Sequence, residues 1–266
     1  MSIEPFSPQV GLSRRACLGA GLAWLGTLAG CASLIDPSGP AVVPRSDAAT
    51  DTLPEAPRTR APRIGLALGG GAARGFAHVG VIQVLEQQGL LPDLVVGTSA
   101  GSLVAALYAS GRNGAELEQA ALRMEEAAIT DWTLPLFNRG LLRGDALARY
   151  VNAQVKGKAI QDMKRPLGIV ATDLANGQSM LFQRGDTGTA VRASSAVPGV
   201  FSPVAIGGRE YVDGGLVAPV PVRQAREMGA EVVLAVDISS APEGNLAVGN
   251  IRVLLQTFAI MGQSIN

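Results

Sequence analysis

The stretch "LPDLVVGTSAGSLVA", residues 91–105, decides the fold because an apolar strand pattern ends in it and a helical pattern begins. Leu94 to Val96 have the pattern of a buried strand, and a helix follows from about Ser102 to Ala109. Between them lies Gly97-Thr98-Ser99-Ala100-Gly101. A serine between two glycines at such a junction is either a catalytic nucleophile or a turn of small residues.

Strand and helix patterns alternate on both sides of this stretch. Helices are expected at about 76–88, 115–127 and 145–155. Strands are expected in "RIGLAL", "PLGIVATDL", "SMLFQ", "REYVDGG" after a Gly207-Gly208 hairpin, and "AEVVLAVDI". The alternation predicts an α/β domain with parallel strands covered by helices.

Composition narrows the class of protein. A chain of 266 residues suits one α/β domain with extra segments. Lys plus Arg and Asp plus Glu both number 22, so no overall positive field would attract nucleic acid, and we expect no nucleic-acid partner. Aromatic residues make up only 4% while there are 33 glycines, which favours tight strand-to-helix units over an aromatic-rich sandwich.

The N-terminal residues have the pattern of an export signal. Arg14 and Arg15 precede an apolar stretch that ends in Leu28-Ala29-Gly30-Cys31, which resembles a bacterial lipobox with Cys31 as the lipidated residue. An uncleaved anchor or twin-arginine export are the alternatives, and both also give a membrane-attached product. We expect an exported bacterial lipoprotein that faces the periplasm, on either the inner or the outer membrane.

Three segments follow from this interpretation. Residues 1–30 are the predicted signal peptide, 31–62 a Pro-, Ala- and Ser-rich tether that starts at the lipidated cysteine, and 63–266 the folded domain. The chain has two cysteines, so a mature domain that starts at Cys31 would hold no disulfide. Residues 250–266 begin a helical pattern that stops without a cap, so the sequence is expected to be a fragment at this end.

Gly97 and Gly101 fit the requirements of a nucleophile elbow, where small residues two positions before and after the serine relieve steric conflict. The five-residue pattern is weak alone, since chance supplies roughly one match in four similar chains. Its position between a strand and a helix strengthens the catalytic interpretation. Ser99 would then sit at the carboxyl edge of the sheet, near the positive end of the following helix.

A nucleophilic serine needs a proton acceptor, and the single histidine does not suit this role. His78 precedes Ser99 in the chain and falls in the first turn of a predicted helix, where packing is expected. A carboxylate is the simplest remaining base. Asp213 is favoured because it ends a strand and precedes Gly214-Gly215, whereas Asp173 and Asp237 are expected to be structural.

The stretch "LALGGGAARGFAHVG" offers donors for an oxyanion. Gly69, Gly70 and Gly71 could present successive backbone amides, backed by the helix that follows. A phosphate-binding loop is the alternative, but the lysine and hydroxyl residue of a Walker loop are missing. Arg74 could support this loop, meet an anionic head group or be solvated.

Together, the glycine loop with Gly75, the G-T-S-A-G turn and the D-G-G turn with Gly214 and Gly215 resemble the patatin-like phospholipase family. The segments "RGLLRGDAL", "ATDLANG" and "RASSAVPGVFSPV" are similar to its small bacterial branch. The resemblance implies a three-layer fold, a mostly parallel central sheet with helices on both faces, and no metal or organic cofactor. It also implies a Ser99–Asp213 dyad, an oxyanion loop at Gly69 to Gly71, and hydrolysis of phospholipid, lysophospholipid or related acyl esters.

The sequence departs from the family pattern at several places. Gly75 comes one residue later than a strict G-x-G-x-x-G spacing allows, Ala218 replaces a frequent asparagine, and a usual C-terminal strand is missing. Residues 194–198 are expected either to line the pocket or to form a structural turn. Core packing or an acyl-binding lip are the alternatives for a group of large apolar residues: Trp132, Leu134, Leu136 and Phe137.

Two other functions are compatible with the same residues. The protein could be a catalytically idle scaffold or regulator at the cell envelope. The same dyad could also carry out acyl transfer or thioesterase chemistry instead of hydrolysis by water.

Overall fold

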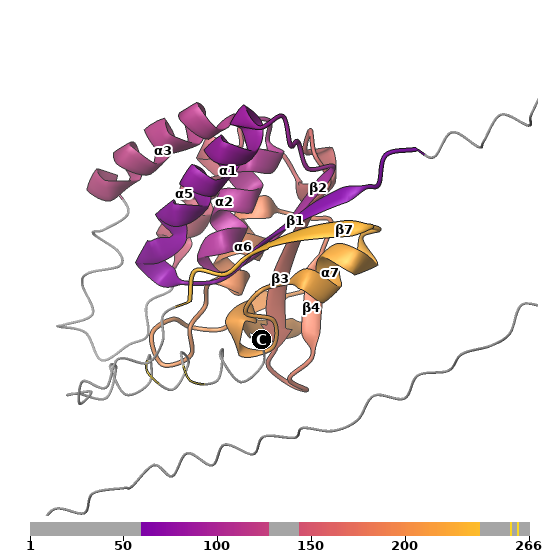
Figure 1. Ribbon diagram of the computed structural model, residues 1–266. Coiled ribbons are helices and arrows are strands. Elements are labelled where there is room, and N and C mark those ends of the chain that lie inside the picture. The colour runs from indigo at the N-terminus through magenta and orange to yellow at the C-terminus, as the bar shows by residue number, and fades with distance from the viewer. Residues whose placement is uncertain (1–59, 128–143, 240–255, 257–259, 261–266) are drawn as a thin grey trace, which may run out of the picture. The chain divides into compact units, whose positions relative to one another are not determined.

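The computed structural model describes residues 60–127, 144–239, 256 and 260. In these residues a seven-stranded sheet has the order β5-β6-β3-β2-β1-β7, and β4 also pairs with β3 (Figure 1). The strands are β1 (Ile64–Leu68), β2 (Leu94–Thr98), β3 (Leu167–Asp173), β4 (Ser179–Phe182), β5 (Val204–Ile206), β6 (Arg209–Asp213) and β7 (Val232–Val236).

The centre of the sheet is parallel and one side of it is antiparallel. β1 pairs in parallel with β2 and β7, and β2 pairs in parallel with β3. β4 and β6 both run antiparallel to β3, and β5 forms a hairpin with β6. Gly207 and Gly208 connect this hairpin with φ values of 59° and 79°, the positive values that a tight two-residue hairpin turn requires. The predicted mostly parallel central sheet and the glycine hairpin are therefore confirmed.

Helices cover both faces of the sheet, so the predicted three-layer architecture is also confirmed (Figure 1). One face carries α1 (Ala77–Gln87), α2 (Ala100–Ala109), α3 (Gly114–Ala127), α5 (Asp145–Gln154) and α6 (Thr187–Ser194). The other face carries α7 (Val222–Glu227). Three 3₁₀ turns, η1 (Ala72–Phe76), η2 (Ile160–Asp162) and η3 (Gly214–Leu216), complete the described elements.

The period-two alternation of the strands explains why the sheet has two buried faces. Leu66 and Val95 pack in the larger core with α1, α2, α5 and α6. Their strand neighbours Ala67 and Val96 point the other way and pack against the α7 side, where Ala225 contributes. Strands that are apolar on both faces are typical of a parallel sheet between helix layers.

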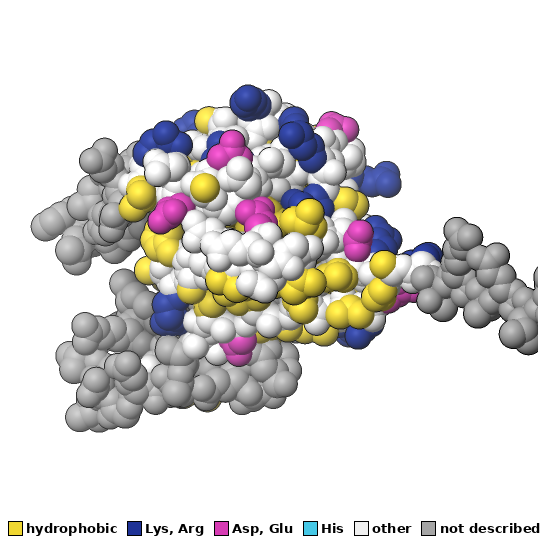
Figure 2. Space-filling view, turned by 45° about the horizontal axis from the view of Figure 1, so that its top comes forward, with side chains coloured by type: hydrophobic (Ala, Val, Ile, Leu, Met, Phe, Trp, Pro, Cys, Tyr) yellow, Lys and Arg dark blue, Asp and Glu magenta, His cyan; other side chains and the backbone are white. Residues whose placement is uncertain are grey.

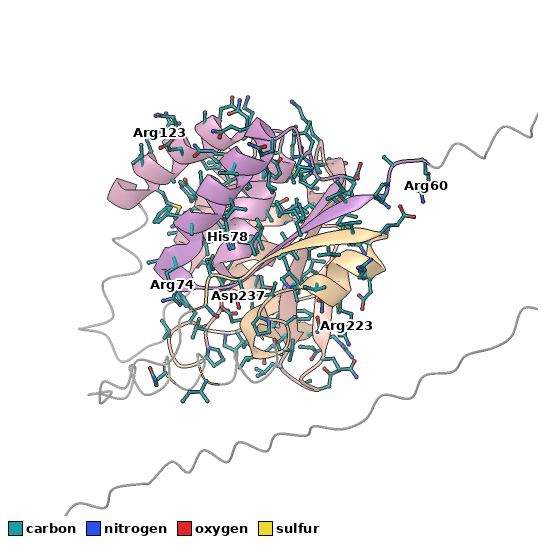
Figure 3. The ribbon with its side chains drawn as sticks, viewed as in Figure 1. Arg60, Arg74, His78, Arg123, Arg223 and Asp237 are labelled. Atoms are coloured by element: carbon teal, nitrogen blue, oxygen red, sulfur yellow. The ribbon has the colours of Figure 1, made fainter. Side chains whose placement is uncertain are left out.

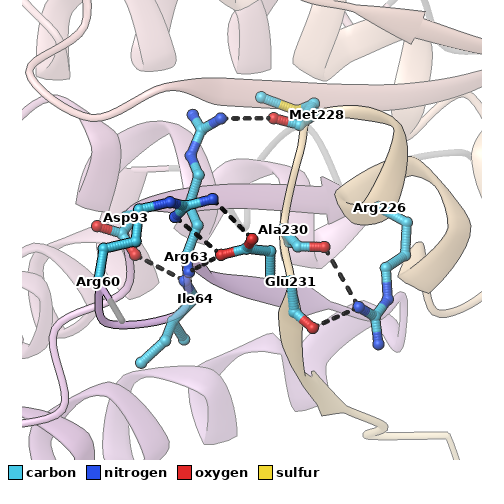
Figure 4. Close-up of polar contacts among 8 residues, drawn as sticks. All are labelled: Arg60, Arg63, Ile64, Asp93, Arg226, Met228, Ala230 and Glu231. Carbon is cyan, nitrogen blue, oxygen red and sulfur yellow. Dashed lines mark hydrogen bonds and ion pairs between the residues drawn. The ribbon is translucent and has the colours of Figure 1, made fainter. Parts of the chain in front are cut away.

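A polar network fixes β1 between its two neighbours at their amino ends (Figure 4). The Arg60 guanidinium donates to both oxygens of Glu231 at 2.9 and 2.7 Å, and the Arg63 amide donates to the same carboxylate at 2.7 Å. On the β2 side, Asp93 accepts the amide of Ile64 at 2.6 Å. Exposed ion pairs contribute little free energy, so the main effect is on strand register.

The surface carries charges of both signs. In Figure 2, Lys and Arg side chains gather over the upper part of the face shown, Asp and Glu lie among them, and hydrophobic side chains form a band below. Within the described ranges, we find no helix whose length and hydropathy would let it cross a membrane.

Several sequence predictions concern residues outside the described ranges. They include the signal peptide at 1–30 with Cys31, nearly all of the tether at 31–62, and the helical pattern at 250–266. The four large apolar residues between Trp132 and Phe137 also lie outside the described residues.

Candidate active site

Ser99 occupies a strained turn between β2 and α2. Its backbone has φ 52° and ψ −123°, a combination that side-chain-bearing residues rarely adopt. A Cβ atom on Gly97 would lie 2.3 Å from the Gly101 carbonyl oxygen, and one on Gly101 would lie 2.2 Å from the Leu68 carbonyl oxygen. Both glycines therefore allow the chain to approach itself closely enough to form the turn.

The turn presents the Ser99 hydroxyl to Asp213. Ser99 Oγ donates a 2.7 Å hydrogen bond to Asp213 Oδ2, and the other carboxylate oxygen accepts the Gly215 amide at 2.7 Å. A Cβ on Gly214 would lie 2.3 Å from the Val170 carbonyl oxygen, so this glycine lets β6 end close to β3. Asp213 is only 3% exposed, whereas Ser99 is partly open to solvent.

Burial makes Asp213 a better base than an ordinary aspartate. Loss of solvent raises the pKa of its carboxyl from 3.8 to about 6, although the hydrogen bonds from Gly215 and Ser99 act in the opposite direction. A carboxylate with a pKa near 6 is still ionised at neutral pH and has a greater affinity for a proton. Burial of this kind is what an aspartate needs to act as a base near neutral pH.

The other two strand-end aspartates make different contacts. Asp173 forms a short ion pair with Arg209 and accepts the Ala175 amide at 2.9 Å. Asp237 is exposed and accepts the Ser239 amide at 2.8 Å. These contacts shape turns and an ion pair, whereas Asp213 contacts the Ser99 hydroxyl.

The glycine loop after β1 passes beside Ser99. A Cβ on Gly70 would lie 3.3 Å from the Ser99 Cβ, so Gly70 faces the serine directly. The Gly69 amide donates to the Val236 carbonyl at 3.0 Å, and the Gly70 amide donates to the Pro219 carbonyl at 2.9 Å. Two of the three amides predicted to stabilise the oxyanion, those of Gly69 and Gly70, are therefore already bonded to main-chain carbonyls. They hold the loop in place and are not free to bind an oxyanion.

The rest of the loop is packed tightly. A Cβ on Gly71 would lie 2.6 Å from Ile238, and one on Gly75 would lie 3.0 Å from Ala100. Arg74 donates from Nε to the Ile238 carbonyl at 2.8 Å, so it supports the loop. Arg74 and Asp237 lie at the same end of the sheet, opposite to the end near Arg60 (Figure 3).

His78 supports the loop from inside the protein. Its Nε2 donates to the Gly69 carbonyl at 2.8 Å, because a carbonyl oxygen can only accept. The side chain is fully buried, and burial lowers the pKa of the imidazole below 6.5. A neutral imidazole that donates to the loop fits the packing role expected from the sequence.

Three hydroxyl groups, whose contacts the sequence did not predict, hold the site together. Thr98 Oγ1 donates to the Ala218 carbonyl and Thr172 Oγ1 donates to the Asp213 carbonyl, both at 2.8 Å. Ser194 Oγ accepts the Ser99 amide at 2.8 Å. The Ala218 contact uses a main-chain oxygen, so it does not need the asparagine that the family often has there. A hydroxyl residue at a strand end was the available signal for both threonines.

Over the described ranges, no three His, Cys, Asp or Glu side chains cluster as metal ligands. The fold and the site together define an α/β protein with a serine and a buried aspartate in contact at the carboxyl edge of a mostly parallel sheet. Comparison with known proteins places this class in a family. The profile described as patatin-like phospholipase matches residues 66–226. The chain belongs to the patatin-like phospholipase family.

Similar proteins come from bacteria and animals. An uncharacterized NTE family protein of Mycobacterium bovis is 37% identical over 184 residues, which cover 69% of this chain and 51% of that protein. Patatin-like phospholipase domain-containing protein 6 of Homo sapiens is 34% identical over 192 residues, 69% of this chain and 14% of that one. The crystal structure of VipD from Legionella pneumophila has a TM-score of 0.48 at 16% identity, covering 58% of this chain and 46% of VipD. The chain thus spans about half the length of the mycobacterial relative.

Proposed function

We propose that this protein is a serine acyl hydrolase that cleaves acyl esters of phospholipids, lysophospholipids or related lipids. The 2.7 Å hydrogen bond from Ser99 Oγ to buried Asp213 is the observation that carries the proposal. It joins a strained serine to a carboxylate whose pKa is raised to about 6. Family membership and a relative named as a lysophospholipase in Debaryomyces hansenii support the lipid substrate class.

In the first half of the reaction, Asp213 accepts the hydroxyl proton of Ser99 while Oγ attacks the carbonyl carbon of the ester. The oxygen of that carbonyl becomes an oxyanion. We assign its stabilisation to the amides of Gly71 and Ala100, the first residue of α2, because a helix leaves its first amides without an acceptor inside the helix. Collapse then expels the alcohol, which takes the proton from Asp213.

In the second half, water hydrolyses the acyl-enzyme. Asp213 removes a proton from the water while the water oxygen attacks the acyl carbon. Asp213 then gives that proton to Ser99 Oγ as Oγ leaves. The free fatty acid departs and the hydrogen bond between Ser99 and Asp213 is restored. The same aspartate therefore serves as base and acid in both halves.

Release of fatty acid from a labelled phospholipid tests the proposal. Wild type, Ser99→Ala and Asp213→Asn are compared with two matched controls. Ser110→Ala removes a hydroxyl at the far end of α2, where it donates to the Leu107 carbonyl, and Asp237→Asn changes another strand-end aspartate. We expect the two controls to retain turnover and the two site variants to lose it. Equal turnover in all five proteins would rule out the dyad.

We also propose that Cys31 anchors the protein to a bacterial membrane from the periplasmic side. The proposal rests on Leu28-Ala29-Gly30-Cys31 after an apolar stretch. Each buried acyl methylene contributes about 0.8 kcal/mol, so two or more chains would hold the protein at a bilayer. Expression of wild type and Cys31→Ser with labelled palmitate tests it. Label in the wild-type protein and none in the variant is expected, and equal incorporation contradicts lipidation at Cys31.

A further inference from the structure

We propose that Ser194 is a positioning residue that fixes the backbone of Ser99 in its reactive conformation. The inference rests on the proposed function, in which Ser99 is the nucleophile. Ser194 lies at the end of α6, in "RASSAVPG", and its side chain is fully buried. It touches the Ser99 main chain rather than the reacting oxygen, so its effect on catalysis would be indirect.

The hydrogen bonds of Ser194 define its orientation. A hydroxyl group has one hydrogen, and Ser194 donates it to the Val170 carbonyl in β3. The hydroxyl oxygen is then left to accept the Ser99 amide at 2.8 Å. The chain of bonds runs from the nucleophile's own amide through Ser194 to β3, a buried strand that pairs with β2, β4 and β6.

The same turn also holds the proposed base. The Asp213 amide donates to the Ala196 carbonyl at 2.9 Å, two residues after Ser194. In the sheet, Asp213 pairs with Ala171, the residue after Val170. The segment from Ser194 to Ala196 therefore contacts the main chain of both members of the dyad, and it sets their separation.

Other serines of the site region show that this arrangement is not the ordinary behaviour of a helical serine. Ser102 Oγ donates to the Ser99 carbonyl and Ser110 Oγ donates to the Leu107 carbonyl, three residues earlier in each case. Such local bonds satisfy a hydroxyl without joining distant segments. Ser194 instead bonds to partners 95 and 24 positions away.

Strain gives the Ser99 contact a catalytic consequence. A residue with φ 52° and ψ −123° keeps that conformation only if its surroundings hold it there. Without an acceptor for its amide, the Ser99 backbone could relax and turn Oγ away from Asp213. Substrate would still bind, but the attacking oxygen would spend less time in line with the ester.

Kinetics of Ser194→Ala and Ser194→Thr test this role, with Thr187→Val as the matched control. Thr187 is a fully buried hydroxyl residue at the other end of α6, and it donates to the Lys158 carbonyl at 2.7 Å. We expect Ser194→Ala to lower kcat at least tenfold with KM changed less than twofold, and Ser194→Thr to recover most of kcat. Thr187→Val should lower Tm while kcat stays within twofold. A proportional loss of kcat and Tm in all three variants would overturn the positioning role.

Hydrogen exchange of the Ser99 amide separates this proposal from the proposed function. We expect exchange in folded Ser194→Ala to be at least tenfold faster than in wild type, and slow again in Ser194→Thr. Faster exchange with unchanged kcat would overturn the positioning role while the dyad stands. If the wild-type protein does not hydrolyse lipid, the proposed function is overturned, and the catalytic role of Ser194 with it. If the Ser99 amide exchanges equally fast in wild type and Ser194→Ala, Ser194 does not hold the Ser99 backbone.

Discussion

Ser99 Oγ donates a 2.7 Å hydrogen bond to Asp213 although the two residues lie 114 positions apart. The contact forms because β2 and β6 both adjoin β3, with β2 parallel to it and β6 antiparallel. β2 and β6 therefore run in opposite directions, but the last residue of each lies beside the same part of β3: Thr98 pairs with Val170, and Asp213 pairs with Ala171. Gly214, which could not carry a side chain so close to the Val170 carbonyl, completes the approach.

Asp213→Asn should stabilise the protein at high pH. The folded-state pKa of about 6 exceeds the ordinary value of 3.8, so this carboxyl favours folding fully below pH 3.8 and loses that contribution as the pH rises through 6. A pKa shift of this size lowers the free energy of unfolding of the wild-type protein by up to about 3 kcal/mol at pH 8. Urea unfolding of wild type and Asp213→Asn at pH 8 and pH 4 measures it. A variant that is less stable at both pH values would contradict the burial argument.

The pH dependence of activity should report the same group. Asp213 must be ionised to accept the Ser99 proton, so kcat/KM is expected to rise with pH and reach half its plateau near pH 6. The profile is measured with a soluble ester whose own charge does not change over this range. A midpoint near pH 4 would mean that the carboxyl is not desolvated in the active form.

Ala72→Gly should stabilise the glycine loop. Ala72 has φ 50° and is exposed, so the substitution removes a left-handed alanine without removing buried contacts. The left-handed conformation costs a non-glycine residue about 1–2 kcal/mol, and the greater freedom of glycine when unfolded offsets part of it, so a gain of about 0.5–1 kcal/mol is expected.

Ala73→Gly is the control for this prediction. Ala73 lies in the same 3₁₀ turn and does not have a positive φ. Glycine there should destabilise the protein by about 0.5–1 kcal/mol. Thermal unfolding of both variants decides the matter, and two changes of the same sign would refute the explanation from backbone conformation.

His78→Phe should lower the stability of the protein by removing the side chain that supports the glycine loop. The substitution leaves the buried Gly69 carbonyl without its donor, which costs about 1–3 kcal/mol. Because burial lowers the imidazole pKa, the native contribution of His78 is complete above pH 6.5 and declines as the pH falls. His78→Gln, which retains a donor, is the control in unfolding measurements from pH 5 to pH 8. A wild-type advantage over His78→Phe that grows towards pH 5 would contradict the neutral imidazole.

The sequence contains strong local signals for most of the fold and for the two proposed catalytic residues. The elbow at Ser99 and the strand end at Asp213 follow from glycine placement. The predicted strands match every strand of the sheet except β5, which only the Gly207-Gly208 hairpin implied. The helix predicted at 76–88 is α1 preceded by the 3₁₀ turn η1. Local patterns of this kind depend on periodicity, which the sequence displays directly.

Two helices and the support of the site are missing from the sequence analysis. The α6 segment "TGTAVRAS" contains glycine and two threonines, so its helical propensity is low and tertiary packing stabilises it. Its Asp186 cap, which accepts the Thr189 amide, was the available signal.

The α7 helix was missed because it is only six residues long, too short to display a helical period. Ser194 was expected in the 194–198 turn, but its bonds to Ser99 and Val170 could not be predicted because those residues lie on other elements. The engaged amides of Gly69 and Gly70 likewise depend on strand order.

A fluorophosphonate probe, followed by peptide mapping, tests the central claim most directly, because it requires Ser99 to be nucleophilic in the folded protein. The label should be found on Ser99 in wild type and in Asp237→Asn, and its rate of attachment should fall at least a hundredfold in Asp213→Asn. A label on another residue, or equal rates in folded wild type and Asp213→Asn, would contradict the serine–aspartate mechanism.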